Sequence, residues 1–169
     1  MNQGSVPHHA PANEPHHSPD DIRDQLRKDH EEALAGLEAL RGQLDHHTCE
    51  SQLRKLRQAW VIHALAEETV VYRALESVHS SDKADERFVE HELVGELFNK
   101  LSRLEPGTRE WNARLTVVRD LIQRHIQSEE ADMMVRLERN FDEKALREMG
   151  ERFRLAHQKL TLLERAKAA

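Results

Sequence analysis

The alternation of apolar and polar positions along the chain predicts long amphipathic helices. From about residue 20 to residue 167, apolar side chains recur in steps of three and four, which places them on one stripe of an α-helix. Pro106-Gly107 is the clearest break in this pattern. We expect five helices, at about 18–45, 50–79, 83–104, 108–139 and 140–167. The residues expected to cap their N-termini are Ser18, Thr48, Thr108 and Asn140.

Short connections between these helices require consecutive helices to run antiparallel. The chain is also long enough to bury a core without disulfide bonds. We therefore expect an all-α fold: an up-down-up-down four-helix bundle over residues 20–139, with an additional C-terminal helix, residues 140–169, packed on the bundle. Residues 1–19 hold four of the five prolines and few apolar side chains. They are expected to form a disordered Pro/His-rich tail.

Polar side chains interrupt the apolar stripe of every bundle helix. A histidine occupies a position where leucine is expected once in each of the four helices: His30, His63, His91 and His125. Glu67 and Glu129 follow in the same stripe, four residues after His63 and His125. Residues at i and i+4 point the same way and lie about 6 Å apart along a helix. Each His-x-x-x-Glu segment can therefore direct an imidazole and a carboxylate to one shared site.

These buried carboxylates need a cation, because an unpaired charge in a core is strongly destabilising. A single histidine on an apolar face is more often a hydrogen-bonded core residue, and a single His-x-x-x-Glu is often a surface pair. Packing does not readily explain the repetition on four helices. We predict six metal ligands, which suit two metals with two imidazoles each and both carboxylates bridging: His30, His63, Glu67, His91, His125 and Glu129. Mixed imidazole and carboxylate ligands favour iron over manganese or zinc.

Composition narrows the function further. The net charge is −6, and basic residues are not clustered as nucleic-acid binding requires. The sequence contains neither an apolar run of about 18 residues, as a membrane span needs, nor a signal-peptide pattern. Cys49 is the only cysteine, so an internal disulfide is impossible, and a reducing cytoplasm is the simplest compartment.

The order of these motifs resembles the hemerythrin-like (HHE cation-binding) domain family over about residues 20–139. The resemblance rests on an acid followed by histidine in the first and third helices, Asp29-His30 and Glu90-His91, and on His-x-x-x-Glu-Glu in the second and fourth. It implies two non-heme iron ions with an oxo or hydroxo bridge. It also implies dioxygen, nitric oxide or peroxide as the small-molecule partners.

One position departs from the oxygen-carrying members of that family. These carriers have a second histidine one turn after the third-helix histidine, where this chain has Gly95. The resulting ligand set is closest to bacterial di-iron proteins of the iron–sulfur-repair type. We expect a protein that binds or senses small oxidants in a stress response. A di-iron redox enzyme that reduces peroxide or nitric oxide, an iron donor for cluster repair, and an iron buffer or metal-free bundle remain alternatives.

Four residues near the motifs are assigned structural roles. Glu68 and Glu130 turn about 100° away from the preceding glutamates, so solvated surface charges are expected rather than contacts that support the ligands. Tyr72 is expected to pack in the core rather than to line the pocket or serve as a redox relay, and Cys49 to be an inert surface thiol.

Overall fold

The computed structural model describes residues 20–42, 45–78 and 82–167. The predicted tail, residues 1–19, lies outside this range. Within it, the regular structure is helical throughout. The helical segments are α1 Ile22–Arg41, α2 His46–Glu67, η1 Glu68–Tyr72, α3 Arg73–Glu76, α4 Asp82–Leu101, α5 Arg109–Ser128, η2 Glu129–Met133, α6 Met134–Asn140 and α7 Glu143–Lys167. The short π-helical segments η1 and η2 join α2 to α3 and α5 to α6 without a break.

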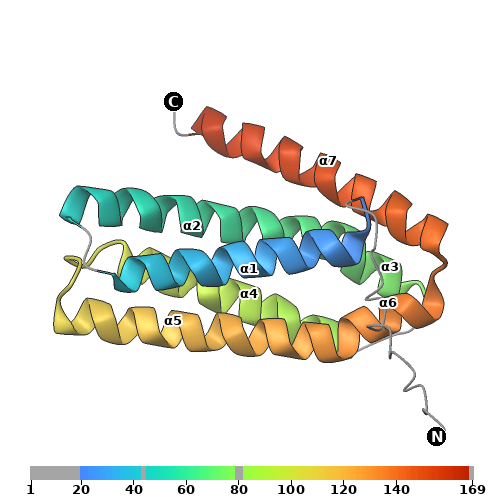
Figure 1. The fold of residues 1–169 in the computed structure, drawn as a ribbon, viewed down its shortest axis with the longest axis horizontal. Coiled ribbons are helices and arrows are strands. Elements are labelled where there is room, and N and C mark those ends of the chain that lie inside the picture. The colour runs from blue at the N-terminus through green and yellow to red at the C-terminus, as the bar shows by residue number, and fades with distance from the viewer. Residues whose placement is uncertain (1–19, 43–44, 79–81, 168–169) are drawn as a thin grey trace, which may run out of the picture.

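Four long helices lie side by side as a bundle, with a further helix across one face (Figure 1). The four sides of the bundle are the contacts of α1 with α2, α2 with α4, α4 with α5, and α5 with α1. Helix α7 packs on α1 and α2 and runs obliquely over them. The predicted all-α bundle with an additional C-terminal helix is thereby confirmed.

The helix starts agree only partly with the predicted caps. Thr108 caps α5 as expected, and its hydroxyl accepts from the Trp111 backbone N–H. Asp45, rather than Thr48, caps α2, because its carboxylate accepts from the Thr48 backbone N–H. Short polar side chains on neighbouring positions compete to accept these N–H groups, and sequence alone does not rank them.

The first and last helices also begin later than predicted. Asp21 caps α1 by accepting from the Arg23 backbone N–H, so the helix begins after the acids and not at Ser18, which lies outside the described residues. At α7 the carboxylate of Asp142 accepts from the Ala145 backbone N–H, while Asn140 ends α6. The predicted helix ends at 45, 79 and 104 lie three or four residues beyond the observed ends at 41, 76 and 101.

The two π-helical segments begin at the glutamates of the His-x-x-x-Glu motifs: η1 directly after Glu67, and η2 at Glu129 itself. A π-turn contains one residue more than an α-turn, so every later position moves to a new face of the helix. After Glu67 the buried side chains are Val71, Tyr72 and Leu75, whereas Val70 and Ala74, which continue the three–four spacing three and seven residues after Glu67, are only partly buried. After Glu129 the buried residues are likewise shifted, and Met133 is fully enclosed.

Two apolar clusters fill the bundle, one on each side of the polar motifs. The first includes Leu53, Phe98 and Trp111; the second includes Leu26, Met133 and Phe153 and extends to α7. Cys49 belongs to the first cluster and is buried, so the prediction of a surface thiol is wrong. Among the described helices, none is long and apolar enough to span a membrane.

A buried ion pair joins the start of α1 to the start of α7. The Arg23 guanidinium makes two hydrogen bonds to the Asp21 carboxylate, of 2.7 and 2.9 Å, and reaches Glu143 at 3.1 Å and Glu138 at 3.4 Å. Gly150 lies against the same end of α1, where a Cβ would clash with the Asp20 carbonyl oxygen. The C-terminal helix is therefore held closely against the bundle.

Candidate metal centre

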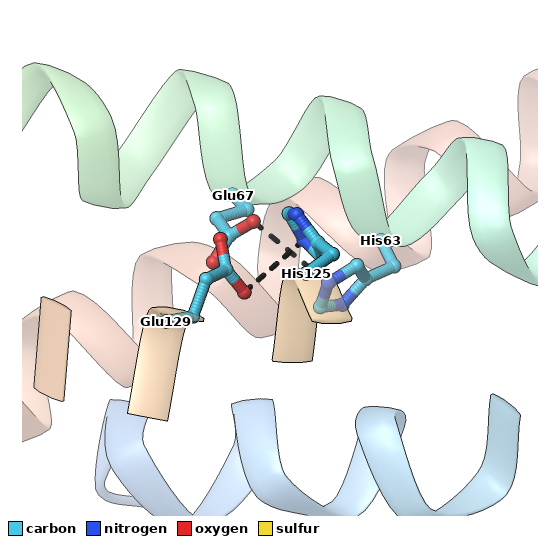
Figure 2. Close-up of side chains that lie close together, drawn as sticks. All are labelled: His63, Glu67, His125 and Glu129. Atoms are coloured by element: carbon cyan, nitrogen blue, oxygen red, sulfur yellow. Dashed lines mark ion pairs between the residues drawn. The ribbon is translucent and has the colours of Figure 1, made fainter. Parts of the chain in front are cut away.

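The structure brings the six predicted ligands together at mid-height of the bundle. Figure 2 shows four of them, His63, Glu67, His125 and Glu129, with their side chains converging. One potential ligand atom from each of these four lies within 4.8 Å of the others. His30 Nε2 lies 3.3 Å from Glu129 Oε2, and His91 Nε2 lies 3.5 Å from Glu67 Oε2. All six side chains are buried. Their role as metal ligands stays a prediction.

The four imidazoles form two pairs. The ring centroids of His30 and His63 are 5.2 Å apart, and those of His91 and His125 are 4.7 Å apart. The Nε2 atoms of the second pair approach to 3.1 Å. Each pair combines one histidine from a His-x-x-x-Glu helix with one from the adjacent helix.

Each glutamate lies between the two imidazole pairs. Glu67 Oε2 is 3.8 Å from Nε2 of His63 and 3.5 Å from Nε2 of His91. On the opposite side, Glu129 Oε2 is 3.2 Å from Nε2 of His125 and 3.3 Å from Nε2 of His30. Both carboxylates therefore contact one imidazole of each pair, which is the position a bridging ligand requires.

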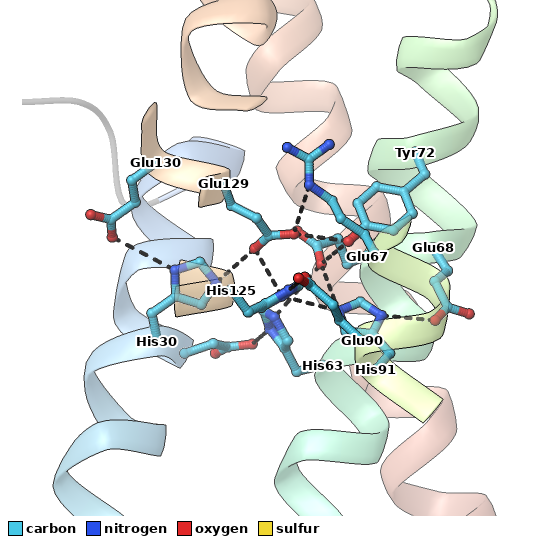
Figure 3. A network of polar contacts seen from close by, with 12 residues as sticks. His30, His63, Glu67, Glu68, Tyr72, Glu90, His91, His125, Glu129 and Glu130 are labelled. Atoms are coloured by element: carbon cyan, nitrogen blue, oxygen red, sulfur yellow. Dashed lines mark hydrogen bonds and ion pairs between the residues drawn. The ribbon is translucent and has the colours of Figure 1, made fainter. Parts of the chain in front are cut away.

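An outer set of carboxylates surrounds the imidazoles (Figure 3). The Nδ1 atom of His63 lies 3.1 Å from Asp29, that of His91 2.8 Å from Glu68, and that of His125 2.9 Å from Glu90. Glu130 lies farther from Nδ1 of His30, at 3.7 Å. We call these four residues, Asp29, Glu68, Glu90 and Glu130, the outer carboxylates.

The outer carboxylates follow the order of the helices around the bundle. Each is adjacent in sequence to a predicted ligand on its own helix and faces the histidine of the next helix, from α1 to α2, α4, α5 and back to α1. Where Nδ1–H donates to a carboxylate, the neutral imidazole presents its Nε2 lone pair to the site. The prediction that Glu68 is a surface charge is wrong, since it is a hydrogen-bond acceptor for His91.

Tyr72 also belongs to the site. Its hydroxyl donates to Glu67 Oε2 at 3.1 Å or to Glu129 Oε1 at 2.8 Å. Tyr72 is five residues after Glu67, a separation that places side chains on different faces of an α-helix. The π-turn of η1 brings them together, which explains why the sequence favoured packing over a place in the site for this residue.

Arg87 is a further charged residue that the sequence reasoning missed. Its buried guanidinium places Nε 3.8 Å from Glu129 Oε1 and Nη2 3.2 Å from Asp132. Arg87 lies four residues before His91, on the same buried stripe as Val94 and Phe98. Its four-residue spacing from His91 was the sequence signal that could have placed Arg87 on the buried face.

Charge within the site shifts the pKa values of several groups. Burial lowers the pKa of His125, but the negative charge of Glu129, 3.2 Å away, outweighs burial and raises the pKa to about 10. The close contacts of His30 with Glu129 and of His91 with Glu67 likewise outweigh burial and raise the pKa values of these two histidines. Burial and the adjacent carboxylates raise the pKa of Tyr72 far above its usual range, so the phenol stays protonated and donates. In the protein alone, the raised pKa of His125 keeps a proton on its imidazole, and this positive charge offsets part of the charge of the buried carboxylates.

Comparison with known proteins identifies the domain. Residues 21–137 match the hemerythrin HHE cation binding domain. The chain belongs to this family. The HHE domain thus covers the whole bundle and ends before α7, which lies outside the matched residues.

One curated relative of this HHE protein is a Nostoc protein named DNA nickase. It is 21% identical over 139 residues, which are 82% of this chain and 40% of that protein. The chain therefore spans less than half the length of this relative. No solved structure matches the chain significantly.

The residues of the HHE site are suited to hold metal ions. Several of its buried polar atoms make no hydrogen bond within the described structure: His30 Nδ1 and Nε2, His63 Nε2, Glu67 Oε1 and Glu129 Oε2. Buried nitrogen and oxygen atoms nearly always have a hydrogen-bond partner. The atoms without one in this site are imidazole nitrogens and carboxylate oxygens, which are common metal ligands. The Nε2 atoms of His91 and His125 also approach each other to 3.1 Å, and a cation between them would replace the proton of this hydrogen bond. A buried His/Glu metal site is therefore well supported.

Proposed function

We propose that this chain is a non-heme di-iron protein that binds or senses small oxidants, dioxygen or nitric oxide, in a stress response. The observation that carries the proposal is the position of Glu67 and Glu129, each between one imidazole of either pair. One pair of imidazoles per metal and two shared carboxylates form a ligand set for two ions. When bound, the iron pair would supply reversible one-electron chemistry and sites for small ligands.

The chain's own residues would set the conditions for that chemistry. The outer carboxylates Asp29, Glu68 and Glu90 hold three imidazoles with Nε2 directed inward. Tyr72 keeps a phenolic proton at the two glutamates, and Arg87 adds a positive charge beside Glu129. Apolar clusters pack the bundle on either side of the site.

Gly95 favours redox reaction over reversible oxygen carriage. It stands where the oxygen carriers that the sequence resembles have a fifth histidine, and it supplies no side chain. A Cβ atom added at Gly95 would have no neighbouring atom within 4 Å, so there is space for the first carbon of a larger side chain. With one ligand fewer, both metals would have a position open to small molecules or water.

Iron content tests the dinuclear assignment. The full chain, purified without a His tag and reconstituted anaerobically with ferrous iron, should bind about two iron ions per chain by elemental analysis. A plateau at one, with both His-x-x-x-Glu motifs intact, would contradict the proposal.

Reaction with oxidants tests the functional part. Stopped-flow mixing of the reduced protein with dioxygen or nitric oxide should change its absorption spectrum, and dioxygen uptake should not reverse under vacuum. Gly95→His should slow the reaction with dioxygen, with Gly95→Ala as the control for helix stability. Reversible uptake by the unsubstituted protein would instead support oxygen carriage.

A di-iron redox enzyme is the second candidate function. Tyr72 favours it, because a hydroxyl that donates to the two glutamates is also placed to donate a hydrogen bond to a peroxide or nitric oxide molecule held beside them. Multiple turnovers with an added reductant would distinguish an enzyme from a sensor. Transfer of iron to a damaged cluster is a third outcome, visible as loss of iron to an acceptor. The relative's name gives no support for an activity on DNA in this chain, because most of that protein lies outside the match.

A further inference from the structure

A large crevice opens between α1, α2 and α7 and ends at the proposed metal centre. Its volume is about 740 Å³, and His30 and His63 are among the residues that line it. A small diatomic molecule needs far less space, since a water molecule occupies only about 30 Å³ in the liquid. Pockets for organic ligands are typically about 300–1,000 Å³. The size of the crevice therefore indicates an organic ligand.

The C-terminal helix supplies one wall of this crevice. Phe153, Arg154 and His157 of α7 line it, opposite residues of α1 and α2. The HHE match ends at residue 137, so this wall comes from a segment beyond the shared domain. Gly150 and the Arg23 ion pair fix α7 against α1 close by. The third wall is thus a built feature of this chain.

The interior of the crevice is mainly apolar. Ala33 and Ala59 leave space that larger side chains would fill, and Leu56, Trp60 and Phe153 provide apolar and aromatic surface. Trp60 is almost fully buried, and its ring lies 5.5–5.8 Å from the rings of three site histidines. A ligand body packed against Trp60 would therefore lie close to the metal centre.

The basic side chains at the rim of the crevice are less engaged in ion pairs than its acids. Each acid in the lining has a close partner: Asp24 with Arg27 at 3.2 Å, Asp29 with the imidazole of His63 at 3.1 Å, and Glu32 with Lys28 at 3.8 Å. Among the described residues Lys55 has no ion pair, and Arg154 reaches only Glu151, at 4.0 Å. Both are exposed at the rim, where they can attract an anion.

We propose that this crevice binds a small amphipathic organic anion, with its apolar body along the accessible Ala33 and Ala59, beside the buried Trp60, and its charged group toward Lys55 and Arg154. An effect of such a ligand on metal chemistry rests on the proposed function, whereas the binding of the ligand to the crevice does not. A ligand seated here is adjacent to His30 and His63 and can alter the access of small molecules to the metals.

The first experiment measures binding of 1-anilinonaphthalene-8-sulfonate by fluorescence, in the metal-free and the iron-loaded full chain. Its neutral analogue N-phenyl-1-naphthylamine serves as the charge control. Ala59→Trp, which fills the crevice from an exposed position, should weaken sulfonate binding about tenfold, equivalent to about 1.4 kcal/mol. Lys55→Glu should weaken the sulfonate about threefold and leave the neutral analogue unchanged.

Matched variants outside the crevice control for nonspecific effects. Ala113→Trp on α5 and Lys159→Glu on α7 change exposed residues that do not line it, and should leave binding unchanged. Circular dichroism melts verify that each variant is folded. Equal binding by Ala59→Trp and the unsubstituted protein would overturn the proposal and place the probe on another surface, such as the exposed Leu155 and Leu162 of α7.

Competition then identifies the class of anion and its link to the metals. Displacement by octanoate but not phenylacetate would assign an aliphatic ligand, and the reverse an aromatic one; displacement by neither would refute the site. In iron-loaded protein, a bound competitor should change the near-ultraviolet absorption, and Ala59→Trp should abolish that change. If the chain binds the probe but no iron, only the proposed function is refuted. If it binds iron normally but not the probe, only the proposed ligand site in the crevice is refuted.

Discussion

Two buried charged clusters lie about two turns apart on α1, and they satisfy their charges in different ways. At Arg23 the guanidinium and the Asp21 carboxylate pair directly, with Glu138 and Glu143 adding acceptors. At the candidate metal centre, four imidazoles and two glutamates leave buried nitrogen and oxygen atoms without hydrogen bonds. The buried pair of the first cluster is neutral by itself, whereas in the second cluster imidazole nitrogens and carboxylate oxygens of the ligand type remain without hydrogen bonds. The comparison indicates that the second cluster, unlike the first, is built for a cation from outside the chain.

The largest effect is expected from removing a shared carboxylate. Glu129→Ala takes away the group that contacts His125 and His30, so iron content should fall from about two per chain to nearly none. Elemental analysis after ferrous reconstitution measures this. Glu92→Ala, an exposed residue beside His91, is the matched control and should retain its iron. Equal loss in both variants would mean that Glu129 is not a ligand.

The pH dependence of the metal-free protein separates the clusters next. The folded-state pKa of His125, about 10, exceeds its ordinary value of 6.5, so its stabilising contribution is complete below pH 6.5 and is lost as the pH rises through 10. The stability that His125 alone contributes in this way is at most about 5 kcal/mol. Urea unfolding in EDTA should show stability falling between pH 6.5 and 9.5. Since Asp21 raises the already high pKa of Arg23, the other cluster stays charged over this range. A flat profile would contradict the charge balance inferred for the site.

Breaking the Arg23 cluster should affect stability and leave metal binding intact. Arg23→Ala strands the buried Asp21 carboxylate and should destabilise the protein by about 3–5 kcal/mol. Replacing both partners, Arg23→Met with Asp21→Asn, should recover much of this loss, because no unpaired charge remains and the cap is preserved. Urea denaturation and iron content are measured on the same samples. Iron loss in the folded double variant would show that the clusters are coupled.

The outer carboxylates should tune the metal centre more weakly. Glu90→Ala removes the acceptor for His125 Nδ1 and should weaken iron binding about 10- to 100-fold. Glu90→Gln keeps an acceptor oxygen and should restore most of the affinity. Competition with a chelator measures both variants, with Glu92→Ala again as control. Failure of glutamine to improve on alanine would argue against an orienting hydrogen bond.

The smallest effect is expected at Tyr72. Tyr72→Phe removes one buried hydroxyl donor while keeping the ring in place, so the protein should lose about 1–2 kcal/mol of stability. Because the hydroxyl contacts both shared carboxylates, the spectrum of the iron-loaded protein should shift although its iron content is unchanged. An unaltered spectrum would confine Tyr72 to packing.

The sequence by itself determined the bundle and the composition of its centre. A strict three–four spacing fixes which face of each helix is buried, and His63, Glu67, His125 and Glu129 lie on that face. Because side chains at i and i+4 share a face, the His-x-x-x-Glu motifs could be placed together without coordinates. His30 and His91 followed from the same spacing on the neighbouring helices.

Only the tertiary structure decided what surrounds that centre. The π-turns after Glu67 and Glu129 rotate the next residues by one position, which brings Tyr72 to the glutamates, and a 3.5-residue pattern contains no information on such a turn. The pairing of Asp29 with His63 and Glu90 with His125 depends on which helices are neighbours and at what height. The crevice beneath α7 depends on the angle at which that helix crosses α1 and α2. Helix periodicity specifies a face, whereas contacts between helices depend on register and crossing angle, which arise only when the chain packs.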